Sequence, residues 1–248
     1  MLVDHLMNTD ARSVLVCSPW ETLIGRTPFT RYRSGFGSEL LHSLEGGAVS
    51  EDLGEIRSGI ETLRAKTSPP EVIPLEELEG WKITDFGVAP CAKGPFVVRH
   101  IEVEARGREV PVWDQPIIDS SDEGSVALIC GRRGGILHFL FRGQGEAGLY
   151  HRVELGPSVD TGTGGIEAVD IPVDYPNAVL RAECRQSEEG GRFFQDVNHY
   201  RILDVDQALE VPFGWYWLTL AQIRTLLDGG GWLTNEARSA LALLLHWL

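Results

Sequence analysis

A group of charged and polar side chains that could do chemistry lies between residues 186 and 200. Two neighbouring acids, Glu188 and Glu189, are followed by two glycines and by Arg192. Carboxylates and guanidinium groups are the side chains that proteins use for proton transfer and for anion binding. Adjacent carboxylates repel one another, and Arg192 is close enough in sequence to be their partner. The alternative is a hairpin tip with a solvated acid pair.

A second candidate group follows an apolar strand pattern. Residues 143–148 have the G-x-G-x-x-G spacing of dinucleotide-binding turns, but residues 150–155 alternate like a strand. The helix that would hold a pyrophosphate is therefore missing, and we predict a glycine-rich connection between strands. The carboxylate in this connection, Glu146, lies near Arg142 in sequence and is a candidate for a pocket lining.

Two further side chains are candidates for a pocket wall. His138 shares one face of a predicted strand with Ile136 and Leu140, which favours a histidine in the core or at a pocket over a metal ligand. Trp113 lies in a segment flanked by prolines and is a candidate for a pocket rim, where an aromatic ring can stack on a sugar. The histidines show no H-E-x-x-H or other metal spacing, so no metal site is predicted.

Charge limits the class of partner. The 248 residues carry a formal net charge of −14. Nucleic-acid binding needs clustered Lys and Arg that neutralise phosphates, so we expect a small-molecule substrate and no nucleic acid. A substrate that carries phosphate would have to meet a local arginine cluster. The available cations are Arg132, Arg133, Arg142, Arg185 and Arg192.

The four cysteines have no Cys-x-x-Cys spacing, so neither a zinc site nor a disulfide framework can be inferred. No apolar stretch approaches the length of a membrane span, and the N-terminal segment lacks an apolar signal region. We expect a cytoplasmic protein with reduced thiols and no membrane contact.

The elements that must position these groups follow from periodicity. Residues 1–49 are expected to form a loosely ordered lead-in with one short element, and a helix is expected from residue 50, ending at 68–70. Residues 81–211 are predicted to be nearly all strand, with strands at 96–103, 109–113, 126–130, 136–141, 150–155, 179–186, 192–196 and 200–205. A capping box at Thr219 opens one C-terminal helix, and Thr234 or Asn235 caps a second. Strands followed by terminal helices indicate the α+β class.

Several stretches together resemble the NDP-hexose 2,3-dehydratase family. The resemblance spans roughly residues 71–245, and its stretches are specific only when they are taken jointly. They are 73–75 with 80–81, 108–110 with 115–118, 135–140, Glu146 with Gly148, 155–159, 186–200, 217–223, and 235–238.

The resemblance implies a Nudix-like α+β fold with a mixed or antiparallel sheet, short flanking helices and C-terminal helices, but without the metal-binding Nudix helix. It divides the chain into an N-terminal lead-in with one helix, residues 1–70, and a Nudix-like module, residues 71–248. Family members usually carry two such modules, and this chain carries one, so a homodimer is the simplest substitute for the second module.

The chemistry that the resemblance implies is loss of water across C2 and C3 of a nucleotide-linked 4-keto-6-deoxyhexose, with no redox cofactor. Glu188 or Glu146 would be the base, and Arg192 would hold the enolate or a phosphate. Gln186 and Asn198 would orient the sugar. The other substrate-binding candidates are Ser187, Tyr200, Arg142, Gln144, His138 and Trp113.

The sequence departs from the family pattern between residues 142 and 165. Gln144 replaces a lysine, Leu149 replaces an asparagine, and residues 160–165 replace a longer polar segment. Losing hydrogen-bonding groups selects against the original ligand. Two alternatives therefore stay open: a repurposed dehydratase or cyclase acting on a less polar, polyketide-like substrate, and a non-catalytic binding or partner module.

Overall fold

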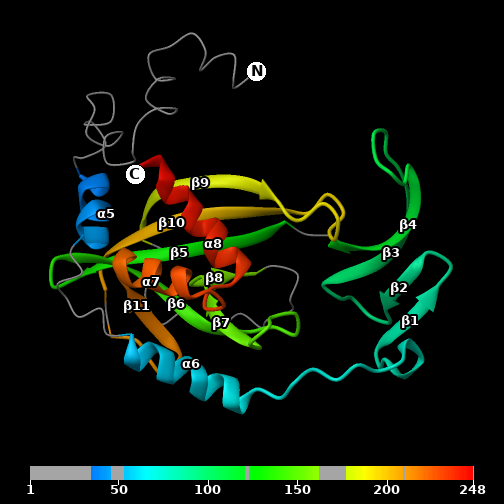
Figure 1. The fold of residues 1–248 in the computed structure, drawn as a ribbon, viewed down its shortest axis with the longest axis horizontal. Coiled ribbons are helices and arrows are strands. Elements are labelled where there is room, and N and C mark those ends of the chain that lie inside the picture. Colours follow the sequence, from blue (N-terminus) through cyan, green and yellow to red (C-terminus); the bar gives the residue numbers. More distant parts are fainter. Residues whose placement is uncertain (1–34, 46–52, 121–122, 162–176, 209, 248) are drawn as a thin grey trace, which may run out of the picture.

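The computed structural model describes residues 35–45, 53–120, 123–161, 177–208 and 210–247, which form two β-sheets and a set of helices (Figure 1). The helices are α5 (Phe36–Glu45), α6 (Gly54–Lys66), α7 (Leu220–Gly229) and α8 (Asn235–Ala242), with 3₁₀ turns η2 (Leu75–Glu77) and η3 (Leu243–His246). None of these helices is long and apolar enough to span a membrane.

The larger sheet has the order β11-β6-β5-β10-β9, with β7 added beside β6 and β8 beside β5. Its strands are β5 (Gly124–Arg133), β6 (Ile136–Gly145), β7 (Val153–Gly156), β8 (Val159–Asp160), β9 (Val179–Ser187), β10 (Val197–Gln207) and β11 (Trp215–Leu218). Strand β10 runs parallel to β5, whereas the other pairs are antiparallel. The sheet is therefore mixed, and the predicted α+β class is confirmed. The Nudix-like arrangement stays a prediction.

Helices α5 to α8 pack on one face of this sheet. Leu128, Phe139 and Ile202 face them from three strands and belong to one apolar core with Leu40 of α5 and Ile60 of α6. Alternate residues of the same strands point to the opposite face, where a smaller apolar cluster lies. Because α5 and α6 contribute to the main core, these two helices pack as part of the larger sheet's body. The division at residue 70 stays a prediction of where the module begins.

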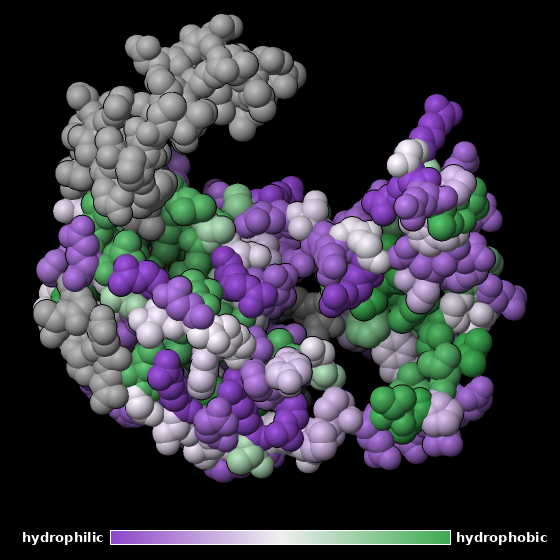
Figure 2. Space-filling model, viewed as in Figure 1, coloured by the Kyte–Doolittle hydropathy of each residue, from purple (hydrophilic) through white to green (hydrophobic). Residues whose placement is uncertain are grey.

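The smaller sheet, which we call the arm, spans residues 81–120 and projects from the body at the right of Figure 1. Its antiparallel strands are β1 (Trp81–Thr84), β2 (Gly87–Pro90), β3 (Phe96–Glu104) and β4 (Val112–Ser120). Pairing aligns Ile83, Val88, Val98 and Ile118 in one row across all four strands. Ile83 is 61% exposed, and Figure 2 shows apolar surface over this part of the molecule.

The arm joins the body through a turn that the sequence suggested was a strand. Residues 192–196 form no strand, so this prediction was wrong: the amides of Arg192 and Phe193 both bond to the Glu189 carbonyl, closing a turn. Phe193 makes a single β-bridge to Ile118, with a main-chain bond of 2.9 Å from the Ile118 amide to the Arg192 carbonyl. The turn that carries Glu189 and Arg192 is therefore the point where the arm is attached.

The expected lead-in also differs from the structure. Helix α5 lies within residues 1–49, where only one short element was expected, and the helix expected from residue 50 is observed as α6. Among the described residues, the segment before residue 70 therefore contains α5 and α6. Residues 1–34 and 46–52 of the lead-in lie outside the described residues.

Candidate active site

The candidate site is built where the β5–β6 hairpin divides. The two strands pair from Arg133 and Ile136 as far as Ile129 and Leu140. Beyond that pair β6 continues with β7, whereas β5 continues with β8. The Ser158 hydroxyl holds the branch point, because it donates to the Leu140 carbonyl at 2.5 Å and accepts from the Ile129 amide at 2.9 Å. We call this branch point the fork.

Three carboxylates meet beyond the fork. Glu146 follows β6, Asp160 ends β8, and Glu236 lies in the first turn of α8. One oxygen from each lies within 4.8 Å of the others, and all three side chains are half-buried. The buried amide of Gln144 donates from Nε2 to Glu146 Oε1 at 2.5 Å and to Asp160 Oδ2 at 2.9 Å. We call Glu146, Asp160 and Glu236 the acid cluster.

A fourth carboxylate belongs to the predicted 186–200 stretch. Glu188 Oε1 accepts from Asn198 Nδ2 at 2.5 Å and from the Tyr200 hydroxyl at 3.0 Å. Asn198 and Tyr200 alternate along β10 and therefore share a face. Pairing places Tyr200 beside Val126 of β5 and Val126 beside Asp160, so the same face carries the acid cluster. Sheet pairing thus brings Glu188 and Glu146, the two candidate bases, to one region.

Electrostatics sets this region apart from the surface. Burial raises the pKa of Glu146, and the charges of Glu236 and Asp160 raise it further. Burial likewise raises the pKa of Glu236, with added repulsion from Asp160 and Glu188. For Tyr200 burial is again the main cause of a raised pKa, followed by the charge of Glu188. Carboxyl groups that keep a proton at higher pH than usual can act as proton donors.

Arg142 is the cation of this region. It is only 6% exposed, and its Nε donates to the Pro157 carbonyl at 3.3 Å. Burial lowers the pKa of its guanidinium, and the charges of Asp160 and Glu146 oppose that change. A buried arginine beside carboxylates balances part of their charge.

Other predicted residues lie elsewhere. The Arg192 side chain is 66% exposed and pairs with Glu189 at 3.0 Å. Trp113, on the arm, donates from Nε1 to Gln115, whose amide in turn donates to the Gly191 carbonyl at 2.8 Å. Both therefore border the turn at 189–194 and lie apart from the acid cluster.

Gln186, Ser187 and His138 line three separate pockets. Gln186 borders a groove of about 560 Å³ between β9 and η3, and Ser187 borders a pocket of about 540 Å³ on the opposite face of the sheet. His138 is 7% exposed, with Nδ1 2.8 Å from the Ile136 carbonyl oxygen. It lies eight residues from Glu146 along a strand, which corresponds to about 26 Å.

Two members of the acid cluster were not candidates from sequence. Asp160 was considered only as part of a shortened segment, and Glu236 is an unmatched position inside the 235–238 stretch of the resemblance. An acid two residues after the Thr234 cap is ordinary for a helix start, where it favours the dipole. Only the packing of α8 across β5 and β10 brings Glu236 to Glu146 (Figure 1).

The acid cluster is also the one group among the described residues with spacing that a metal ion could bridge. Exposed acidic groups are often this close without an ion. We assign no metal site, and the expectation that none is needed stays a prediction.

A model of the NDP-hexose 2,3-dehydratase family matches residues 60–244 of the chain. Three curated proteins named dTDP-4-dehydro-6-deoxy-alpha-D-glucopyranose 2,3-dehydratase are similar to it. The protein from Saccharopolyspora spinosa is 32% identical over 97% of this chain and 52% of its own length. The Amycolatopsis orientalis protein is 29% identical over 96% and 48%, and the Streptomyces violaceoruber protein is 32% identical over 97% and 54%.

The chain thus spans about half the length of the curated relatives it matches. Among solved structures, the crystal structure of C. elegans Ap4A hydrolase matches with 12% identity and a TM-score of 0.34, covering 50% of this chain and 96% of that one. The family match covers most of the chain, including the fork, the acid cluster and the 186–200 stretch. This protein therefore belongs to the NDP-hexose 2,3-dehydratase family.

Proposed function

We propose that the protein is a lyase that removes water across C2 and C3 of a nucleotide-linked 4-keto-6-deoxyhexose. Family membership and the names of the relatives support this substrate class. The observation that carries the proposal is the meeting of Glu188, Glu146 and Glu236 on one face of the sheet. Elimination of water needs a proton acceptor and a proton donor in one place, and this face supplies both.

The reaction begins at C3, because the C4 ketone acidifies the C3 hydrogen. A carboxylate takes this proton and the electron pair of the C3–H bond moves toward C4. The C2–O bond then breaks, the hydroxyl leaves as water with a proton from a carboxylic acid, and a C2–C3 double bond forms. The product is an enol that tautomerises to a 2-deoxy-3,4-diketone. Every atom is accounted for without an oxidant or a reductant.

We assign the base to Glu188 and the acid to the acid cluster. Asn198 and Tyr200 hold Glu188 Oε1 from two sides and so orient the carboxylate. Glu146, whose pKa burial and Glu236 raise, is the proton donor. Arg192 is exposed on the turn and is left for the phosphates of the nucleotide, because its guanidinium is accessible from solvent.

The test separates the two proton transfers. The protein is incubated in D₂O with dTDP-4-dehydro-6-deoxy-alpha-D-glucopyranose, and exchange at C3 is followed by NMR beside formation of the 2-deoxy product. Wild type should perform both. Glu146→Gln should keep C3 exchange and lose product, whereas Glu188→Gln should lose both. Absence of exchange and of product with wild type, beside an active relative, would sink the proposal and favour a different substrate.

Three further features belong to the proposal. The protein acts as a homodimer, because a second copy would supply the half that the longer relatives have in addition. The reaction needs no cofactor, since the keto group already present activates the hydrogen. The protein works in the cytoplasm, where nucleotide sugars are made from soluble precursors.

A further inference from the structure

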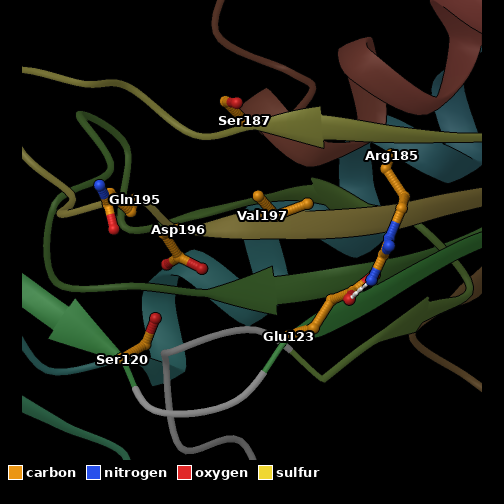
Figure 3. Close-up of a pocket in the computed structure, with 7 residues that line it drawn as sticks. All are labelled: Ser120, Glu123, Arg185, Ser187, Gln195, Asp196 and Val197. Carbon is orange, nitrogen blue, oxygen red and sulfur yellow. Dashed lines mark hydrogen bonds and ion pairs between the residues drawn. The ribbon is translucent and has the colours of Figure 1, made fainter.

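A pocket of about 540 Å³ lies where the arm meets the larger sheet (Figure 3). Its lining residues are Ser120, Glu123, Arg185, Ser187, Gln195, Asp196 and Val197. Val197 pairs with Ser187, and neighbouring residues on a strand point to opposite faces. The pocket is therefore on the other side of the sheet from Asn198 and Tyr200, and it takes no part in the proposed dehydration.

The chemical character of the pocket is set by Asp196. This residue is only 7% exposed and borders the cavity. Among the residues that the structure describes, no hydrogen bond or ion pair engages its carboxylate, although its main-chain carbonyl accepts from the Glu188 amide. Because the residue borders the cavity, a ligand that brings a cation or several hydrogen-bond donors can pair with this carboxylate.

Hydroxyl and amide groups also line the pocket. Figure 3 shows the Ser120 hydroxyl turned toward Asp196, and that hydroxyl is itself buried without a partner. Ser187 and Gln195 are exposed at the rim, and Gln195 has a φ of 51°, an uncommon conformation for a residue with a side chain. The described lining contains no aromatic ring, so stacking of a base is not what this pocket offers.

The charges of the described lining residues leave one negative charge uncompensated. Arg185 is used by Glu123, to which it makes two hydrogen bonds, one of them 2.8 Å from Nε to Oε1. Figure 3 shows this pair at one side of the pocket, away from Asp196. The fixed cation of the lining is therefore satisfied, and the Asp196 carboxylate is left for the ligand.

We propose that this pocket binds a small ligand in which a protonated amine stands beside hydroxyl groups, as in an amino sugar. The ammonium group pairs with Asp196, and the hydroxyls bond to Ser120, Ser187 and Gln195. The cavity volume suits a ligand of one sugar ring, since small-molecule sites start at about 300 Å³.

The test is an NMR titration of the ¹⁵N-labelled full chain with glucosamine, and with glucose as the probe that lacks the amine. Glucosamine should cause saturable shifts in the amide signals of Asp196 and Val197. Glucose should bind with an affinity at least about tenfold lower. Asp196→Asn should weaken the binding of glucosamine by about tenfold. Asp228→Asn, at an exposed position near the end of α7, is the matched control and should bind as wild type does.

A second variant keeps the result interpretable if Asp196→Asn folds poorly. Ser187→Lys places a cation at the exposed rim, where folding tolerates it, and should repel glucosamine while leaving the spectrum otherwise unchanged. Equal affinity for the two sugars, glucosamine binding that neither variant weakens, or no saturable shift at all would each overturn the proposal.

Discussion

At the scale of single residues, the site depends on carboxyl groups that look alike in sequence and differ in surroundings. Glu188 and Glu189 are neighbours, but Glu188 is held by Asn198 and Tyr200, whereas Glu189 is exposed and pairs with Arg192. The chemistry we propose therefore belongs to only one member of the acid pair.

This difference gives a matched pair of variants. Glu188→Gln should lower kcat by about 10²- to 10⁴-fold, because general-base catalysis contributes about that much. Glu189→Gln removes the same charge from the next residue and should stay within about twofold of wild type. Steady-state rates on the nucleotide sugar decide the matter, and similar losses in both variants would contradict the assignment.

The pH dependence of the reaction follows from the acid cluster. Burial raises the pKa of Glu146 and the charge of Glu236 raises it further, so activity that needs the protonated form should fall as pH rises. Glu236→Gln removes that charge, the pKa of Glu146 falls, and the loss of activity should move to lower pH. The profile of kcat/KM against pH measures this shift. Glu210→Gln, an exposed acid that pairs with Arg133, should leave the profile unchanged.

Sequence reasoning named several residues that the structure brings near one another, and their roles stay predictions. Glu188, Asn198 and Tyr200 lie in one short stretch, and Gln144 and Glu146 lie in another, so composition and spacing made them visible. Glu236 has no such neighbours in sequence. Its role depends on how α8 crosses the sheet, which is a long-range packing event that local pattern does not encode.

At the scale of elements, periodicity located the β5–β6 hairpin but misplaced its ends. The apolar runs stop at Cys130 and begin again at Ile136, which suggested a connection of five residues. The ladder continues through Arg132 and Arg133, and the turn is only Gly134–Gly135, with φ values of 58° and 79°. Strand pairing depends on main-chain hydrogen bonds, which polar residues also make, so hydrophobicity marks the buried part and not the whole strand.

The stability of the fork should depend on the hydroxyl group of Ser158. Ser158→Ala leaves the Ile129 amide and the Leu140 carbonyl without their shared partner in a buried place, so the free energy of unfolding should fall by about 1–3 kcal/mol. Urea unfolding followed by circular dichroism measures it. Ser58→Ala, at an exposed position on α6, is the control and should change stability by less than about 0.5 kcal/mol. Equal stability of the two variants would contradict the role given to Ser158.

Helix α5 is tied to the sheet by a charge network that sequence did not indicate. Arg132 bridges Glu39 of α5 and the buried Asp204, and Arg181 bonds to Asp204 at 2.7 Å. Burial opposes ionisation of Asp204, but its hydrogen bonds from Arg132 and Arg181 outweigh burial and lower the pKa. The stability from this network is therefore present above the pKa of a free aspartate, about 4, and is lost as pH falls below it.

Variants of the neighbouring residues Arg132 and Arg133 distinguish this buried network from an ordinary surface ion pair. Arg132→Met should lower the free energy of unfolding at pH 7 by about 3 kcal/mol, because it leaves Asp204 buried without its main partner. It should also make stability less dependent on pH between about 5 and 2. Arg133→Met breaks only an exposed pair and should cost less than about 1 kcal/mol. Denaturant unfolding at several pH values checks both expectations.

At the scale of the whole molecule, the arm carries a row of apolar side chains in which Ile83 is exposed. Sheets usually bury an apolar face against another element, and a second copy is the partner that the length of the relatives suggests. Light scattering should give the mass of two 27.4 kDa chains. Ile83→Asp should give one chain, whereas Thr84→Asp, on the other face of the strand, should not. A wild-type protein that is monomeric in solution would contradict the proposed homodimer.

The position of α8 also has a consequence for how the site comes into being during synthesis. Glu236 enters the acid cluster from α8, and Ala237 and Ala240 of that helix lie in the main core. A ribosome releases this helix only after every strand of the larger sheet has emerged. The strands of the larger sheet therefore cannot assemble the complete cluster before α8 has emerged, and the activity we propose would be acquired only when α8 docks on them.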